Sequence, residues 1–196
     1  MIVFDIETTG TDPYKHSILS IGAIDFENPT EQFYMECRVW EGARVEQEAL
    51  DVNGYSREAT KDPAKSEEGT IVAEFLKWLD GRQNILLVAQ NPIFDLSFLQ
   101  AAAARAHLDF TVGRRSLDLH TVAFMHMVQR KIAPPTKNRK SDINSDGIME
   151  YVGIPTEPKP HIAINGAVWE AEALSRLIFS KNLLVQFAQY PIPWLS

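Results

Sequence analysis

Residues 4–10 read FDIETTG, a short apolar stretch interrupted by two acids. Asp5 and Glu7 alternate with Phe4 and Ile6, so both carboxylates project from one face of a strand and the apolar pair projects from the other. Acids are poor strand formers, and two acids on one face repel each other. The pattern predicts a strand that carries paired carboxylates for chemistry; the alternative is a strand with an ordinary solvent-facing surface.

Around this stretch, the hydrophobic pattern alternates between strands and helices. Strands are expected at residues 2–6, 18–26, 33–40 and 85–89, and helices at residues 67–80, 94–107, 118–130, 145–152 and 165–179. Turn residues separate the first three strands, which predicts an antiparallel meander. The helix and the strand that follow predict a mixed α/β sheet flanked by helices. Asn165 is expected to cap the N-terminus of the last helix.

Length and composition narrow the class of protein. A chain of 196 residues with 45% hydrophobic and 23% charged residues is expected to form one domain, residues 1–196. Its one cysteine, Cys37, cannot form an intramolecular disulfide, which favours a reducing, cytoplasmic location. Apolar runs such as residues 85–89 are far shorter than the roughly 20 residues that span a bilayer. We therefore expect a soluble protein that does not contact membranes and has no secretory signal.

The net charge of −7 argues against broad electrostatic attraction to nucleic acid. Two features oppose that argument. Carboxylates that bind divalent cations are neutralised by them, and basic side chains gather in one segment: Arg130, Lys131, Lys137, Arg139 and Lys140. Residues 134–145 are polar, basic and proline-containing, which predicts a mobile loop. This loop either contacts phosphates or is an ordinary solvated charged loop.

Two motifs resemble a known family. FDIETTG resembles the first motif of the DEDD exonuclease superfamily, which includes proofreading subunits, ribonuclease T and oligoribonuclease. Residues 90–99, QNPIFDLSFL, are similar to its second motif, and Asp95 matches the catalytic aspartate. Residues 48–55 and 116–118 resemble the segments that follow the first and second motifs. The resemblance implies a ribonuclease-H-like fold: a five-stranded mixed sheet, with an antiparallel meander plus parallel strands, flanked by helices.

The third motif is incomplete. In the His-containing subclass a histidine is followed five positions later by an aspartate; here His161 is present, but the aspartate position is Gly166. Glu170 lies one helical turn further, rotated by only ~40° and displaced by ~6 Å, and its side chain would reach back toward the gap. Glu172 lies about 120° away around the helix, and Asn165 has only a neutral amide. Glu170 therefore either replaces the aspartate or is an ordinary exposed helix residue.

By this resemblance, the chain removes nucleotides from 3′ ends of single-stranded DNA or RNA and releases nucleoside 5′-monophosphates. Two divalent cations, Mg²⁺ or Mn²⁺, would be held by Asp5, Glu7, Asp95 and, in the first of those readings, Glu170. His161 would act as general base because imidazole titrates near neutrality.

The resemblance also implies residues that contact substrate. Thr8 and Thr9 would lie near the terminal nucleotide, and Asn91 and Phe94 near the cleft that holds the strand. Two other functions are open: a catalytically impaired pseudo-exonuclease that binds nucleic acid or protein, and an endonuclease. The sequence leaves open DNA versus RNA as substrate, homo-oligomer formation and the cellular pathway. The apolar tail, residues 190–195, is expected to pack on its own domain rather than on a partner.

Overall fold

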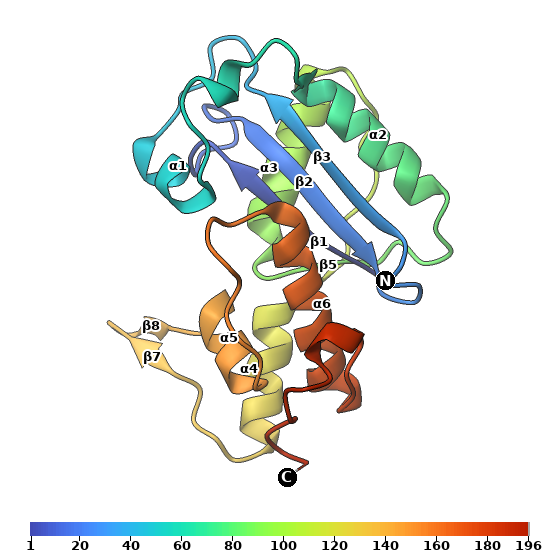
Figure 1. Cartoon of the computed structure of the whole chain (residues 1–196), viewed down its shortest axis with the longest axis vertical. Helices are drawn as coiled ribbons and strands as arrows, with labels where there is room; N and C mark the ends of the chain where they lie inside the picture. Colours follow the sequence, from blue (N-terminus) through green and yellow to red (C-terminus); the bar gives the residue numbers. More distant parts are fainter. Residues whose placement is uncertain (196) are drawn as a thin grey trace.

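A computed structural model describes residues 1–195, and its centre is one six-stranded sheet in the order β4-β3-β2-β1-β5-β6 (Figure 1). The strands are β1 (Ile2–Thr8), β2 (Ile18–Asp25), β3 (Gln32–Arg38), β4 (Ser66–Glu67), β5 (Leu87–Ala89) and β6 (Ser116–Asp118). β1, β2 and β3 form the predicted antiparallel meander, while β5 and β6 continue the sheet in parallel. The predicted count of five strands was wrong: β4 pairs with β3 but has only two residues, too few to show a strand pattern.

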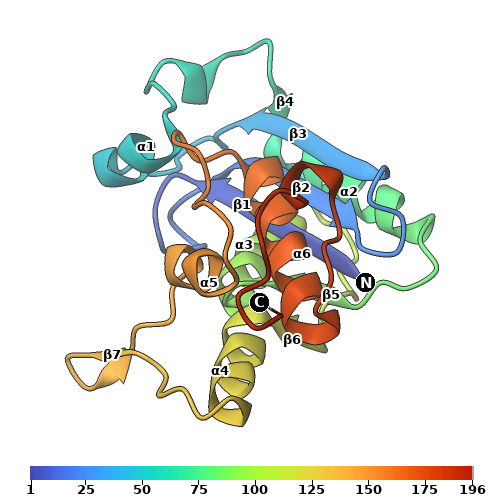
Figure 2. The same ribbon diagram turned by 60° about the horizontal axis from the view of Figure 1, so that its bottom comes forward.

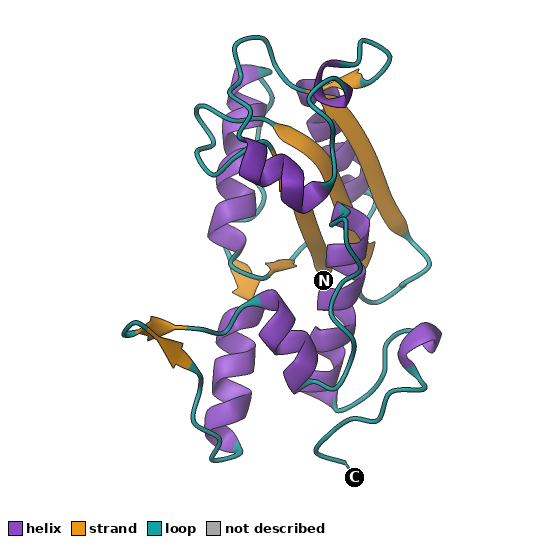
Figure 3. Ribbon diagram, turned by 60° about the vertical axis from the view of Figure 1, so that its left-hand side comes forward, coloured by secondary structure: helices purple, strands orange, loops and turns teal. Residues whose placement is uncertain are grey.

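Six α-helices surround the sheet: α1 (Gln47–Asn53), α2 (Glu68–Asp80), α3 (Pro92–Arg105), α4 (Leu119–Gln129), α5 (Ser145–Tyr151) and α6 (Ala163–Phe179). Two short 3₁₀ turns, η1 (Ala59–Lys61) and η2 (Val185–Phe187), complete the helical elements of residues 1–195. Within the segment predicted as a mobile loop, β7 (Thr136–Lys137) and β8 (Lys140–Ser141) form a hairpin that projects from the body of the molecule (Figure 3). None of the helices in residues 1–195 has both the length and the apolar character needed to cross a membrane.

β1 divides two hydrophobic cores. Phe4 and Ile6 pack in the core that contains buried residues of α2 and α3, and the Phe4 ring lies 6.2 Å from the ring of Phe75. Val3 packs in the other core, with buried residues of α4, α5 and α6. Because successive side chains of a strand point to opposite faces, Asp5 shares the face of Val3 and is turned toward α6.

The start of α6 lies directly on the sheet. Gly22 of β2 pairs with Asp5 of β1, and a Cβ at Gly22 would come within 2.2 Å of the Ala163 carbonyl carbon. Only glycine permits this approach, so it brings the first turn of α6 beside the acids of β1. The predicted N-cap at Asn165 was wrong, because α6 begins at Ala163 and Ile162 occupies the cap position without a side-chain cap.

The C-terminal tail packs on its own domain, as predicted. Trp194 Nε1 donates to Ser180 Oγ at 2.9 Å, and its ring lies 4.3 Å from that of His126. Arg176 of α6 is fully buried; it donates to Glu172 Oε1 at 2.8 Å and to the backbone carbonyls of Phe187, at the end of η2, and of Tyr190. Glu172 therefore pairs inside the C-terminal core and does not face the acids of β1.

Candidate active site

A pocket of about 200 Å³ gathers three of the four predicted acids, Asp5, Asp95 and Glu170, from distant parts of the chain; Glu7 does not line it. It is lined by Asp5, Gln90, Asn91, Phe94, Asp95, Ser145, Glu157, His161, Gly166 and Glu170. These side chains come from β1, the start of α3, the start of α5, the segment before α6, and α6 itself. Figure 2 shows α5 beside α6, in agreement with their direct packing, and α6 in turn packs on β1.

The turn from β5 into α3 positions Asp95. Asn91 adopts a left-handed backbone, with φ of 60°, and Pro92 occupies the first turn of α3. The Asn91 amide donates to Asp118 Oδ1 at 3.1 Å, which fixes the turn to the end of β6. Asp95 follows in the first helical turn with only 3% of its surface exposed, so its carboxylate is held inside the pocket.

Gly166 lies against Asp5. A Cβ at residue 166 would be 2.2 Å from Asp5 Oδ2 and 2.8 Å from Asp5 Cγ. The space that an aspartate side chain would need at this position is therefore filled by the carboxylate of Asp5. Glycine at residue 166 is what lets α6 pack so closely on β1.

Glu170 is not an ordinary exposed helix residue. Only 5% of its surface is exposed, and it lines the pocket one turn beyond Gly166. Its Oε2 atom accepts a hydrogen bond from the Gln90 amide at 3.0 Å. This bond holds the glutamate at the end of β5, on the side of the pocket where α3 begins.

The acids repel one another and lack cationic partners. Burial, followed by the neighbouring charge of Glu157, raises the pKa of Asp5 to about 8. Burial, followed by the charge of Asp5, raises the pKa of Glu7 to about 9 and those of Asp95 and Glu170 well above their ordinary values. No Lys or Arg of residues 1–195 forms an ion pair with any of these carboxylates.

Glu157 is a pocket acid that the sequence analysis missed. Its Oε1 atom accepts from the Ile162 amide at 3.1 Å, and its Oε2 atom lies 3.5 Å from His161 Nδ1. Burial raises its pKa, while the neighbouring His161 acts in the opposite direction. The residue lies in an irregular, proline-rich stretch, and its only sequence signal is an acid four residues before the histidine.

The predicted substrate contacts divide into two groups. Asn91 and Phe94 line the pocket with the acids. The side chains of Thr8 and Thr9 are buried and already bonded: Thr8 Oγ1 donates to the Gly10 carbonyl at 2.8 Å, and Thr9 Oγ1 donates to the Arg44 carbonyl at 2.7 Å. These two hydroxyls shape the loop after β1 and do not line the pocket.

The carboxylate oxygens of the pocket are suitable ligands for a divalent cation, although they do not converge on one point. No three Asp, Glu, His or Cys side chains within residues 1–195 already have a metal-binding arrangement. Four carboxylates, those of Asp5, Asp95, Glu157 and Glu170, nevertheless line the pocket, and Glu7, on the same face of β1 as Asp5, is buried without a hydrogen-bond partner among the described residues. Oxygen donors of this kind suit Mg²⁺ and Mn²⁺, and such ions would offset the repulsion between the acids.

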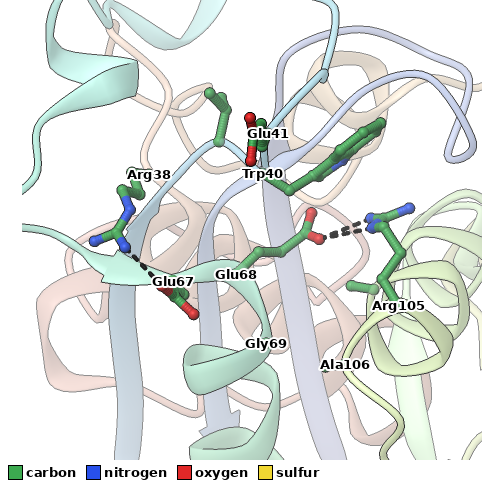
Figure 4. Close-up of a pocket in the computed structure, with 10 residues that line it drawn as sticks. Arg38, Trp40, Glu41, Glu67, Glu68, Gly69, Arg105 and Ala106 are labelled. Atoms are coloured by element: carbon green, nitrogen blue, oxygen red, sulfur yellow. Dashed lines mark hydrogen bonds and ion pairs between the residues drawn. The ribbon is translucent and has the colours of Figure 1, made fainter.

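A larger cleft of about 480 Å³ lies at the other edge of the sheet, between β4, α2 and α3 (Figure 4). Four of its five charged side chains are paired with one another: Arg105 Nη2 lies 2.8 Å from Glu68 Oε2, and Arg38 Nη2 lies 2.7 Å from Glu67 Oε1. The carboxylate of Glu68 also accepts from the Ile18 amide at 2.9 Å. These contacts hold α2 and α3 to the sheet, which gives the paired charges of the larger cleft a structural role. The smaller pocket, whose acids lack cationic partners, is therefore the candidate active site.

The mixed sheet flanked by helices has the ribonuclease-H-like fold, and the acidic pocket lies at its strand β1. The chain belongs to the exonuclease family: the family model described as Exonuclease (RNase_T) matches residues 2–167. This membership confirms the superfamily predicted from the first two motifs.

Two relatives are similar over part of their length. Ribonuclease T of Haemophilus influenzae is 30% identical over 116 residues, which cover 53% of this chain and 51% of the relative. Ribonuclease T of Yersinia enterocolitica is 34% identical over 119 residues, or 55% of each protein. The match thus spans about half the length of these relatives.

Solved structures of Escherichia coli Exonuclease I share the fold at low sequence identity. A complex with a dT13 oligonucleotide has a TM-score of 0.71 and 17% identity, covering 89% of this chain and 40% of that one. A zinc-bound complex with single-stranded DNA has a TM-score of 0.74 and 17% identity, covering 91% and 40%. These structures confirm the predicted ribonuclease-H-like architecture.

Proposed function

We propose that residues 1–196 form one exonuclease domain that hydrolyses phosphodiester bonds from the 3′ ends of single-stranded DNA or RNA with two divalent cations. One observation carries this proposal. Asp5, Asp95 and Glu170 come from three separate elements and line one pocket beside His161, although 165 sequence positions separate the first from the last.

Cations at this pocket would be held by Asp5, Glu7, Asp95 and Glu170. When bound, Mg²⁺ or Mn²⁺ makes water more acidic and stabilises negative charge on the phosphate. His161 would take a proton from the attacking water; its side chain is 28% exposed at the rim of the pocket, where it can return that proton to solvent.

The relatives support a nucleic-acid substrate. Exonuclease I has been solved with single-stranded oligonucleotides, and the matched curated proteins are ribonucleases. In this chain, the Phe94 ring and Asn91 would contact the last bases, and the backbone around Thr8 and Thr9 the terminal nucleotide. The exposed β7–β8 hairpin would place Arg139 and its basic neighbours on phosphates further along the strand.

A 3′-processing assay tests the function. A 5′-labelled single-stranded oligonucleotide is incubated with Mg²⁺, Mn²⁺ or chelator, and the products are separated by length. The expected result is a ladder shortening from the 3′ end, release of nucleoside 5′-monophosphates, and no reaction with chelator. Asp5→Asn should abolish the ladder, while Glu150→Gln, on the exposed side of α5, serves as the matched control.

Two other outcomes would contradict the proposal. A folded protein that degrades nothing with either metal but retains the oligonucleotide in a binding assay is a pseudo-exonuclease, the function that Gly166 favours. Cleavage of circular single-stranded DNA would instead show an endonuclease. The proposed cytoplasmic location rests on the single buried cysteine, Cys37, and is tested by fractionating cells.

A further inference from the structure

We propose that Glu157 supplies the carboxylate that is missing at Gly166. The pocket then holds two sets of ligands that share Asp5: one with Glu7 and Glu157, the other with Asp95 and Glu170. This inference rests on the proposed exonuclease function and deepens it, because it assigns a cation ligand from a segment that carries no motif.

Glu170 belongs to the α3 side of the pocket. Its Oε2 atom is bound to the Gln90 amide, five residues before Asp95 in the chain. The charges that act on Glu170 follow the same arrangement: its pKa is raised first by burial and then by Asp5 and Asp95, with Glu157 the weakest contributor. The Gln90 bond and the shared pocket therefore place Glu170 beside Asp95, on the side where α3 begins.

Glu157 belongs to the opposite side. The Ile162 amide that binds its Oε1 atom begins α6, at the point where Ala163 rests on Gly22 of β2. Next along the same face of β2 is Ser20, which pairs with Glu7 across the strands. Glu157 lines the same pocket as Asp5 and Gly166, and its charge raises the pKa of both Asp5 and Glu7.

The side chain of Glu157 has one oxygen available for a cation. Oε1 is occupied by the Ile162 amide, but Oε2 is 3.5 Å from His161 Nδ1, beyond the usual 2.7–3.2 Å of an N–H to oxygen hydrogen bond. Glu7 nearby is 8% exposed and has no hydrogen-bond partner among residues 1–195. Glu7 and the unbonded Oε2 atom of Glu157, together with Asp5, are oxygen ligands of the kind that a divalent cation requires.

The arrangement also explains why residue 166 is glycine. An aspartate at that position would compete with Asp5 for the same space, because its Cβ alone would be 2.2 Å from Oδ2. Glu157 lies in the segment before α6 and lines the same pocket as Asp5, so its side chain does not have to pass through the contact between α6 and β1.

Calorimetric titration of the metal-free protein with Mn²⁺ tests this assignment without relying on activity. We expect two binding events in the wild-type protein. Glu157→Gln keeps the shape of the side chain and the bond from the Ile162 amide, and should weaken one event at least tenfold. Glu170→Gln should weaken the other event by a similar factor, and Glu150→Gln should leave both unchanged. The two weakened events must differ, which the double variant shows by losing both.

Unchanged Mn²⁺ binding in a folded Glu157→Gln variant overturns the inference. If that variant binds Mn²⁺ normally but has a reduced kcat, Glu157 is a positioning residue for His161 and not a ligand. If Glu157→Gln does not fold, Glu157→Asp decides, since its shorter carboxylate should still weaken one event. A wild-type protein that degrades oligonucleotides while Glu157 variants bind Mn²⁺ normally refutes only this inference. A wild-type protein that binds no Mn²⁺ and cleaves nothing refutes the proposed function as well.

Discussion

Substitution of Gly166 by alanine should displace the carboxylate of Asp5. The new Cβ would lie 2.2 Å from Oδ2, whereas ordinary contact begins at 3.4 Å, so the two groups must separate by about 1.2 Å. Over-packing of this kind costs about 1–3 kcal/mol, which for a chain of this size lowers the melting temperature by roughly 2–12 °C. A ligand moved by about 1 Å reduces turnover by roughly 10²-fold.

The effect is measured as the rate of 3′-end shortening under saturating Mn²⁺, together with thermal unfolding. Gly166→Asp should be at least as impaired as Gly166→Ala, because it adds a further carboxylate where Asp5 lies. Gly81→Ala is the matched control: its Cβ would have only one neighbour, the Trp78 carbonyl oxygen at 3.5 Å. Wild-type rate and melting temperature in Gly166→Ala would refute the close packing of α6 on β1, and a gain of activity in Gly166→Asp would refute the idea that this position has no room.

Three further predictions concern pH, a buried ion pair and the hairpin. Without metal, the pKa values of about 8 for Asp5 and about 9 for Glu7 exceed the ordinary values of these groups, near 4. Between about pH 4 and 9 the folded protein therefore binds more protons than the unfolded chain. Its free energy of unfolding should fall as the pH rises through this range. The melting temperature, measured in chelator at several pH values, tests this fall in stability. Added Mn²⁺ should reverse the fall at high pH. A melting temperature that rises with pH in chelator would contradict the prediction. Arg176→Met leaves Glu172 buried without its cationic partner and should lower the free energy of unfolding, measured in denaturant, by about 3–5 kcal/mol. A loss below about 1 kcal/mol would show that the ion pair is dispensable. Arg139→Ala should weaken oligonucleotide binding and reduce the salt dependence of log K by about 0.7, whereas unchanged binding would make the hairpin an ordinary solvated loop.

In the acidic pocket, the packing of the surrounding elements holds carboxylates close together although their charges repel. Its carboxylates are held by backbone amides and by the contact of α6 with β1, so they cannot separate to relieve their repulsion. A divalent cation offsets several negative charges at once, and the protein without cations is therefore expected to be less stable near neutral pH. Because a bound cation stabilises the folded protein, variants of Glu157 and Glu170 that bind Mn²⁺ more weakly should also gain less thermal stability from added Mn²⁺.

The sequence by itself determined the class of this protein. Alternation around Asp5 and Glu7 predicted the first strand and its shared acidic face, because the period of a strand is a local property. The turn at Asn91 and Pro92 likewise predicted the start of the helix that carries Asp95. Helical geometry placed Glu170 on the face of Gly166, and the structure brings both to the same pocket.

Only the tertiary structure decided which further acid joins the site. Glu157 lies in an irregular stretch without periodicity, and its position depends on where the Ile162 amide and α6 meet the sheet. The close contact of Gly166 with Asp5 depends on two elements more than 150 residues apart, a separation that no local pattern encodes. Local propensity fixes strands, turns and helix faces, whereas the meeting of side chains from distant segments is set by packing of the whole core.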